Sequence, residues 1–300
     1  MSRKPPASAL ERYLAHLVNE RRLSAHTVAA YARDNASLAM LAGERDLDSL
    51  TPPDIRRFIA TLHSKGLAPR SLGRTLSSWR GFYEWRIREK AVAANPCAGV
   101  RSPKMAKPLP GMLSPEDAIR LVTHDEPDSP FAVRDRALFE LIYSSGLRVS
   151  EITGADVDAI DLDEAQVRVL GKGSKTRIVP VGQGALDALA RWLPERSKRA
   201  APGEAALFVD AKGKRITPRQ VQTLIKARAA AAGLDMDVHP HMLRHSFASH
   251  VLQSSGDLRA VQEMLGHASI ASTQVYTHLD FQHLAKVYDA AHPRARKKAK

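Results

Sequence analysis

Cysteine is nearly absent from this 300-residue sequence, which contains only Cys97. A single cysteine cannot form an internal disulfide, and it excludes zinc or iron–sulfur centres built on several cysteine ligands. Long apolar runs are also missing, because no segment approaches the ~18 consecutive apolar residues of a membrane span. The first residues lack the apolar core of a signal peptide. We therefore expect a cytoplasmic protein.

Motifs for nucleotide hydrolysis and metal-dependent hydrolysis are missing as well. The P-loop pattern is broken because Gly171-Lys172 is followed by glycine and Gly213-Lys214 by arginine. No G-x-S-x-G sequence is present, and no pair of carboxylates has the spacing of a metal site. The sequence therefore indicates neither nucleotide hydrolysis nor two-metal nuclease chemistry.

Acidic residues are the scarcer charged type: 32 Asp and Glu oppose 45 Lys and Arg, which gives a net charge of +13. The excess lies mostly in residues 1–107, where 19 basic and 9 acidic residues give +10. The remaining 26 basic and 23 acidic residues give +3. Such an imbalance favours a polyanionic partner, most often nucleic acid. The alternative is a generally basic, well-solvated protein.

The first third of the sequence has helical periodicity and no strand pattern. Residues 8–90 place apolar side chains three and four positions apart. Ser24 is a suitable N-cap for a second helix, Thr51 precedes a third, and Pro69 begins a fourth. We expect a helical bundle over residues 1–95.

Basic residues recur along the fourth predicted helix. Helical spacing allows Arg70, Arg74 and Arg80 to share one face. An ordinary solvated face is the alternative, but the local excess of positive charge favours contact of Arg70 and Arg74 with phosphates.

A linker is predicted over residues 96–112. The segment 100–110 contains three prolines and three cations, Lys104 among them, and no acid. This composition favours an extended, exposed chain between two domains, whose cations could lie along a phosphate backbone.

The second predicted domain, residues 113–292, mixes helices with a small sheet. Alternating valines at 167 and 169 and an apolar run at 178–181 flank a glycine-rich, cationic turn, which predicts a β-hairpin. A second hairpin is expected over 206–216. Successive helices are expected at 240–253, 258–265, 273–279 and 282–290, and a basic tail at 293–300.

Histidines gather between residues 239 and 245. His241 and Arg244 are three positions apart on a helix that Pro240 can begin, so they project into the same space. An imidazole beside a guanidinium suits a phosphate or a carboxylate. Two alternatives remain open: a helix that is merely rich in histidine, and a metal site made by His241 and His245.

Four further residues stand at turns or beside them, and each has an ordinary explanation. Arg148 follows a glycine turn, Lys172 occupies the hairpin tip, His267 follows a helix-ending glycine, and Tyr276 comes nine residues later. Taken singly, Arg148 suggests a surface ion pair, Lys172 an ordinary turn residue and Tyr276 a packing residue. Together with the histidine cluster they form an ordered set: Arg148, Lys172, His241, Arg244, His267 and Tyr276.

This ordered set resembles that of the tyrosine recombinases, also called the phage integrase family. The residues from Leu23 to Tyr31 are similar to the helical DNA-binding domain of the same family. The resemblance implies a mainly α fold: a SAM-like N-terminal helical bundle and a mixed α+β catalytic domain, which clamp duplex DNA. It also implies DNA cleavage and rejoining without a cofactor.

The family resemblance assigns the phosphate-binding groups. Arg148 and Arg244 would hold the oxygens of the scissile phosphate, and His267 would add a hydrogen bond to one of them. Lys104 and Lys175 would contact DNA elsewhere.

The resemblance also assigns the reacting groups. Tyr276 would attack the phosphorus, form a 3′-phosphotyrosyl bond and release a 5′-hydroxyl. His241 would accept the tyrosine proton or orient the site. Lys172 would protonate the leaving oxygen, with Lys175 as the alternative.

Partners follow from the same resemblance. We expect a tetramer on two DNA sites, containing two copies each of this chain and of a related recombinase, in a process linked to a DNA translocase. The last helix, from about residue 281 to 291, would dock into a neighbouring subunit, although packing on its own domain is the alternative. A non-catalytic DNA-binding protein, another integrase and a type IB topoisomerase remain the competing functions.

Overall fold

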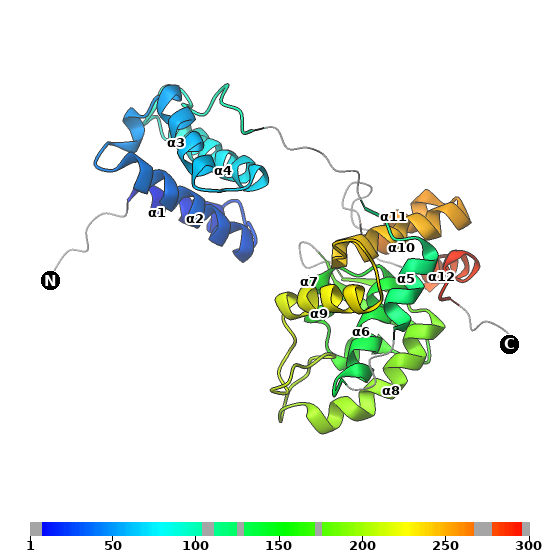
Figure 1. Cartoon of the computed structure of the whole chain (residues 1–300). Coiled ribbons are helices and arrows are strands. Elements are labelled where there is room, and N and C mark those ends of the chain that lie inside the picture. Colours follow the sequence, from blue (N-terminus) through cyan, green and yellow to red (C-terminus); the bar gives the residue numbers. More distant parts are fainter. Residues whose placement is uncertain (1–7, 104–110, 125–128, 172–175, 267–277, 296–300) are drawn as a thin grey trace. The chain divides into compact units, whose positions relative to one another are not determined.

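The computed structural model describes residues 8–103, 111–124, 129–171, 176–266 and 278–295, with only the backbone for 278–283. The chain divides into two compact units, residues 1–108 and 109–300 (Figure 1). The described part is mainly helical and has one small antiparallel sheet, as predicted. None of its helices is long and apolar enough to cross a membrane.

Helices make up the N-terminal unit, as its periodicity predicted. Ser8 and Ser24 cap the first two helices, where each hydroxyl accepts a hydrogen bond from a backbone N–H of the first turn. Prolines begin the next two helices. A backbone N–H in the first turn has no acceptor within the helix, so its absence from proline removes no hydrogen bond. The elements are α1 (Ala9–Asn19), α2 (Ala25–Ala42), the 3-10 turn η1 (Leu47–Ser49), α3 (Pro52–Ser64) and α4 (Pro69–Arg88).

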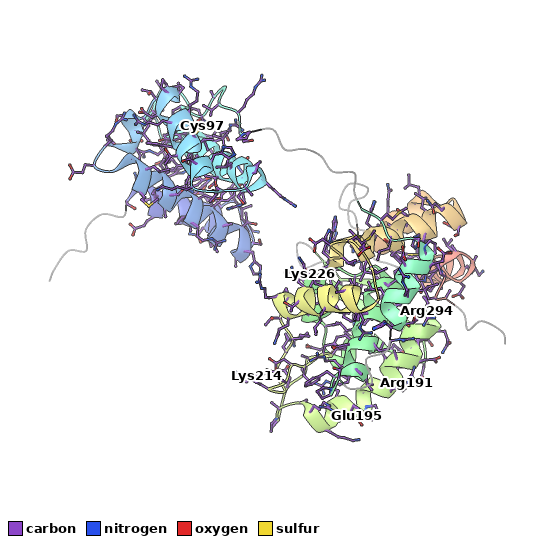
Figure 2. All side chains as sticks on the ribbon, viewed as in Figure 1. Cys97, Arg191, Glu195, Lys214, Lys226 and Arg294 are labelled. Atoms are coloured by element: carbon purple, nitrogen blue, oxygen red, sulfur yellow. The ribbon has the colours of Figure 1, made fainter. Side chains whose placement is uncertain are left out.

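The core of the N-terminal unit is built around α4, which contacts the other three helices. Trp79 and Phe82 of α4 are fully buried there. Cys97 and Val100, which lie beyond α4, are 0% and 2% exposed in the same core (Figure 2). The prediction of an exposed linker from residue 96 was therefore wrong at its start, because these two side chains complete the core.

The C-terminal unit surrounds helix α6, which is buried on all sides and packs against α5, α8 and α10 (Figure 1). Its helices are α5 (Pro115–Thr123), α6 (Ala132–Ser145), α7 (Val149–Gly154), α8 (Gln183–Arg199), α9 (Pro218–Ala231), α10 (Pro240–Ser255), α11 (Leu258–Leu265), α12 (His278–Ala291) and the 3-10 turn η2 (Val157–Ala159).

The sheet has the order β1-β2-β3, with β1 (Ile160–Asp161), β2 (Gln166–Leu170) and β3 (Thr176–Pro180). The predicted hairpin is confirmed: β2 and β3 pair antiparallel, with Val167 opposite Val179 and Val169 opposite Arg177. The second predicted hairpin is reduced to a turn with a single bridge between Val209 and Arg215. It is too short to form strands.

The C-terminal helix differs from its prediction in two ways. Helix α12 begins at His278 rather than at residue 282 and runs to Ala291, whereas the helix expected at 273–279 lies mostly outside the described residues. Leu284 and Tyr288 are each 1% exposed and belong to the core of their own domain, against α10 and β3. The apolar stripe that was expected on a neighbouring subunit therefore packs on its own domain, the alternative given for this helix.

The beginning of the predicted basic tail is also held in the domain. Arg294, labelled in Figure 2, forms an ion pair with Glu140, which is fully buried in α6. The carbonyl of Ala295 accepts a hydrogen bond from the N–H of Gln183. Contacts with α6 and α8 therefore fix Arg294 and Ala295, which the prediction had assigned to the tail.

Candidate active site

Helix α10 carries the histidine-rich cluster of the sequence. His239 is its N-cap, and its Nδ1 accepts a hydrogen bond from the N–H of Met242 at 3.1 Å. Pro240 follows as the first helical residue. The next turn brings His241 to an exposed position and Arg244 to a buried one. One histidine of the cluster is thus a cap, while His241 and Arg244 lie one turn apart.

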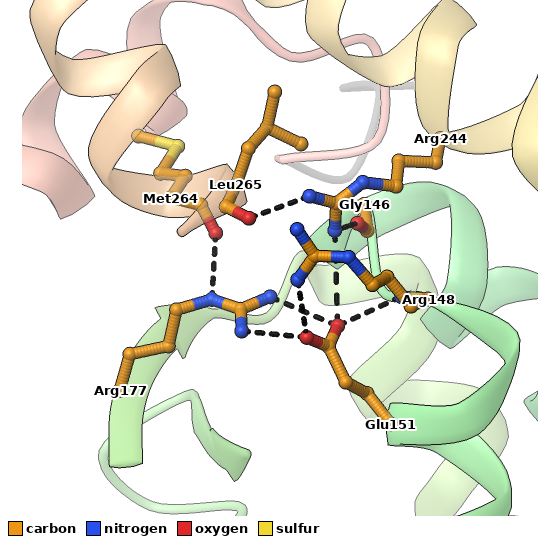
Figure 3. Close-up of polar contacts among 7 residues, drawn as sticks. All are labelled: Gly146, Arg148, Glu151, Arg177, Arg244, Met264 and Leu265. Carbon is orange, nitrogen blue, oxygen red and sulfur yellow. Dashed lines mark hydrogen bonds and ion pairs between the residues drawn. The ribbon is translucent and has the colours of Figure 1, made fainter. Parts of the chain in front are cut away.

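Arg244 ties two other segments together (Figure 3). Its guanidinium donates to the carbonyl of Gly146, between α6 and α7, at 2.7 Å, and to that of Leu265, at the end of α11, at 2.5 Å. Gly146 has a φ of +56°, and a Cβ there would lie 2.3 Å from the ring of Phe247. Only glycine fits this turn, so the carbonyl that holds Arg244 depends on it.

Arg148 lies at the start of α7 and forms an ion pair within its own first turn. Its guanidinium donates to Glu151 at 2.7 Å, and its backbone N–H donates to the other carboxylate oxygen at 2.8 Å. The side chain of Arg148 is 38% exposed, whereas that of Glu151 is 3% exposed. The buried carboxylate therefore holds a guanidinium that still reaches solvent.

Arg177 of β3 occupies the other side of the same carboxylate. It donates two parallel hydrogen bonds to Glu151, at 2.7 and 2.9 Å, and a third from Nε to the carbonyl of Met264 at 3.0 Å. Arg244 lies 3.7 Å from Glu151 as well. Figure 3 shows Glu151 at the centre of three guanidinium groups. We call Arg148, Glu151, Arg177 and Arg244 the arginine cluster.

The electrostatics of the arginine cluster favour an anion. Burial alone would raise the pKa of Glu151, but hydrogen bonds and charge from Arg177, with help from Arg148, lower it. The carboxylate is therefore ionised and balances one of three positive charges. Burial, followed by the charge of Arg148, lowers the pKa of Arg244 to about 10, which still leaves it protonated at neutral pH. A phosphate is an anion that planar guanidinium groups bind well.

His241 is the candidate proton acceptor beside this cluster. Partial desolvation of the largely exposed ring lowers the pKa of His241, and the neighbouring His239 and Arg244, with His245 and Arg148, contribute to the same shift. The neutral imidazole, which can accept a proton, is thereby favoured. No group of three potential metal ligands occurs among the described residues, so the pair His241 and His245 gains no third ligand there.

The structure brings together three of the predicted catalytic residues: Arg148, His241 and Arg244. Arg148 and Arg244 lie at the same carboxylate, that of Glu151, and His241 is one turn before Arg244 on α10. Five other predicted site residues lie outside the described residues: Lys104, Lys172, Lys175, His267 and Tyr276.

The basic residues predicted on α4 have different surroundings. Arg70 is exposed. Arg74 forms an ion pair with Asp34 of α2, a carboxylate that is 6% exposed and also accepts a hydrogen bond from Thr75. Arg80 is directed toward the carbonyls of Cys97 and Val100. Arg80 is therefore a structural residue, whereas Arg70 and the 42%-exposed Arg74 present charge at the surface.

Sequence reasoning missed the roles of Glu151 and Arg177. A signal for each was present. Glu151 is three residues after Arg148, the spacing of a capping box. Arg177 alternates with Val179 and faces Val169 across the hairpin, so it occupies the apolar face of the sheet. A charged residue at a core-facing position indicates a buried partner.

Comparison with known proteins agrees with this site. Residues 112–283 match the Phage integrase family, and residues 10–90 match the Phage integrase, N-terminal SAM-like domain. The chain belongs to the phage integrase family. It is 55% identical to Tyrosine recombinase XerC 1 of Ralstonia nicotianae, over 98% of this chain and 96% of that protein. It is 51% identical to Tyrosine recombinase XerC of Pseudomonas aeruginosa, over 96% of each.

The fold of the family is shared with distant members too. The structure of a lambda integrase dimer bound to a COC' core site has a TM-score of 0.69 and 17% identity, over 89% of this chain and 98% of that one. Family membership and the close XerC relatives establish this chain as a XerC-like, tyrosine-type site-specific recombinase, which acts by strand cleavage and rejoining.

Proposed function

We propose that the arginine cluster binds the scissile phosphate of double-stranded DNA and that Tyr276 attacks it. The observation that carries the proposal is the excess of positive charge around Glu151, with Arg148 partly exposed and Arg244 one turn from His241. Guanidinium groups stabilise the charge that develops on the non-bridging oxygens during phosphoryl transfer. His267 would add a hydrogen bond there.

The chemistry of the proposed nucleophile requires such a neighbourhood. A free tyrosine has a pKa of about 10 and is a weak nucleophile at neutral pH. Nearby arginines favour its anion, and His241 is the proposed acceptor of its proton. Attack on phosphorus forms the 3′-phosphotyrosyl bond and expels the 5′-oxygen, which takes a proton from Lys172 or, as the alternative, from Lys175. Because the covalent bond conserves the phosphoester, rejoining is the reverse step.

The proposed substrate is a dif-like site in duplex DNA. Arg70, Arg74, Lys104 and Lys175 would contact its backbone, so that both the helical domain at 1–95 and the catalytic domain at 113–292 bind the duplex. Its partner would be a XerD-like recombinase, in a tetramer with two copies of each chain, activated by an FtsK-type translocase. Resolution of chromosome or plasmid dimers in the cytoplasm during cell division is the proposed biological role.

A nicked substrate tests this proposal. In a dif-like duplex nicked beside the scissile phosphate, the released strand segment diffuses away and a covalent protein–DNA complex accumulates. The wild-type chain should give a complex that survives detergent. Tyr276→Phe should give none, while its affinity for DNA stays within a few-fold. A chain that binds DNA and never forms the complex would be an architectural protein.

A further inference from the structure

Arg177 is one of the two buried arginines of the cluster, and it connects three segments of the chain. Its side chain is 5% exposed, against 38% for Arg148. It joins β3 to α7 through the two hydrogen bonds to Glu151, and to the last turn of α11 through the carbonyl of Met264 (Figure 3). An arginine this deeply placed is fixed at three points of its guanidinium.

Each of these three segments leads directly to a residue of the proposed mechanism. Strand β3 begins one residue after the segment 172–175, which contains Lys172. Helix α7 begins after Arg148, and α11 ends two residues before His267. Arg177 therefore contacts the chain directly beside three residues that must act together in the proposed mechanism.

Close packing reinforces this junction. Gly266 has a φ of +63°, and a Cβ there would lie 3.1 Å from Cδ of Arg177. The turn that follows α11 thus fits against the aliphatic part of the arginine as well as receiving its hydrogen bond.

Arg177 also determines how the two carboxylate oxygens of Glu151 are distributed among the three arginines. It engages both carboxylate oxygens, whereas Arg148 donates a single side-chain hydrogen bond and Arg244 lies 3.7 Å away. Without Arg177, the carboxylate would be shared between Arg148 and Arg244 alone. It would then compete with a phosphate for these two guanidinium groups.

We propose that Arg177 is a positioning residue for DNA cleavage, a role that rests on the proposed function. It holds Glu151 away from Arg244 and locks β3, α7 and the end of α11 in one arrangement. Arg177 does not touch the phosphate itself, because all three of its guanidinium nitrogens donate to Glu151 and Met264. Its loss should therefore slow the chemical step more than it weakens DNA binding.

Single-turnover cleavage of the nicked duplex, with the full chain in saturating excess, separates positioning from folding. A purely structural defect lowers the fraction of chain that reacts, which is the amplitude, while the folded molecules react at the normal rate constant. A positioning defect lowers the rate constant itself. Small misplacements of reacting groups cost about 100-fold in rate, so we expect Arg177→Met to lower the rate constant roughly 10- to 100-fold.

Two variants accompany Arg177→Met. Arg177→Lys keeps the charge but cannot form the two-pronged pair and the bond to Met264 together, so its rate constant should also fall at least tenfold. Arg168→Met, on the neighbouring strand, removes an exposed arginine that bonds the carbonyl of Asp158 and should cleave at the wild-type rate. DNA affinity of all three should stay within about threefold of wild type.

The outcomes are distinct. Wild-type rate constants in both Arg177 variants, with only the amplitude reduced, would overturn the positioning role while leaving the proposed function intact. A wild-type chain that forms no covalent complex would overturn both. If Arg177→Met does not fold, Arg177→Lys decides, and a normal rate constant in that variant would reject the proposal.

Discussion

A single buried carboxylate organises the candidate site at the scale of residues. Glu151 accepts hydrogen bonds from Arg148 and Arg177 and lies within 4 Å of Arg244. Burying such a group is costly unless it is paired, and breaking a buried pair leaves uncompensated charge. The arrangement therefore orients the arginines, but substitution of any one partner is costly. Such an arrangement suits the proposed role of holding a phosphate in one position.

Glu151→Gln should destabilise the C-terminal unit by roughly 3 kcal/mol at pH 7, the order expected when a buried ion pair loses one partner. Because the pKa of Glu151 is lowered in the folded chain, its contribution is fully present above the ordinary carboxyl pKa of about 4.5. The contribution is lost as the pH falls through the lowered value. Calorimetry of the full chain between pH 4 and 8 measures the difference from wild type.

Glu195→Gln is the matched control for this substitution. Glu195 also pairs with a basic residue, Lys198 at 2.6 Å, but on the exposed surface of α8 (Figure 2). Exposed ion pairs contribute little, so the unfolding temperature should hardly change. Equal effects of the two substitutions would contradict the central structural role of Glu151.

Helix α12 is the element whose packing matters most for the site. It begins two residues after Tyr276 and is built into its own domain by Leu284, Tyr288 and the residues that follow. The His292 ring stacks on that of Tyr288 at 4.9 Å, and its Nδ1 accepts a hydrogen bond from the N–H of Arg294 at 3.1 Å. The helix that follows Tyr276 in the sequence is therefore fixed to the catalytic domain.

Truncation after Asp280 should destabilise the C-terminal unit severely. Each buried large apolar side chain contributes about 1.5–3 kcal/mol, and the truncation removes Leu284 and Tyr288 together with the buried Ala291. We expect low soluble yield or an early thermal transition. A truncated chain that melts at the wild-type temperature would show that α12 is dispensable for the core.

The stability of this element should depend on pH through His292. Burial, together with the nearby His250 and Arg294, lowers the pKa of His292 to about 3, whereas an unfolded histidine has a pKa of about 6.5. The stability that the neutral ring provides is fully present above about pH 6.5, the unfolded value. It is lost as the pH falls toward 3. The expected slope is about 1.4 kcal/mol per pH unit between pH 6 and 4.

His292→Gln should remove this slope, because an amide does not bind the proton. Stability measured by denaturant at several pH values should therefore fall less steeply on acidification in the variant than in the wild type. His245→Gln, at an exposed position of α10, should retain the wild-type slope. Parallel curves for wild type and His292→Gln would rule out the buried neutral ring.

The sequence predicted the helices and strands better than it predicted the surfaces that they pack against. Caps such as Ser24 and the period-2 valines of the hairpin are local signals, so helices α1–α4 and strands β2 and β3 could be placed without a structure. The apolar stripe with Leu284 and Tyr288 specifies a helix that needs a surface, but not which surface. Likewise, the burial of Arg177 depends on Glu151, 26 positions away, which no local pattern reports.

Charge distribution is the property that matters at the scale of the whole molecule. The first 107 residues carry +10 of the total +13. A protein that neutralises phosphates releases counterions, so its DNA affinity falls with salt in proportion to the number of contacts. Asp34 holds Arg74 at the surface of the N-terminal unit, while Arg70 is exposed beside it along α4.

Arg70→Gln should reduce the magnitude of the log–log salt slope of DNA binding by about 0.9, the value for one lost phosphate contact. Binding of the full chain to a dif-like duplex between 50 and 300 mM salt, roughly the range over which counterion release is measured, gives the slope. Arg191→Gln, an exposed arginine of α8 that the proposal does not assign to DNA, should keep it unchanged (Figure 2). An unchanged slope in Arg70→Gln would remove this residue from the DNA contacts.

The identity of the residue that becomes linked to DNA tests the central claim most directly. Trypsin separates the two tyrosines of the C-terminal region, because Tyr276 lies in peptide 260–286 and Tyr288 in peptide 287–294. Tyr288 is 1% exposed and burial raises its pKa, so it cannot attack a phosphate without unfolding. Mass spectrometry of the trapped complex should therefore find the nucleotide on peptide 260–286, at Tyr276. A nucleotide on peptide 287–294, or on neither, would contradict the account.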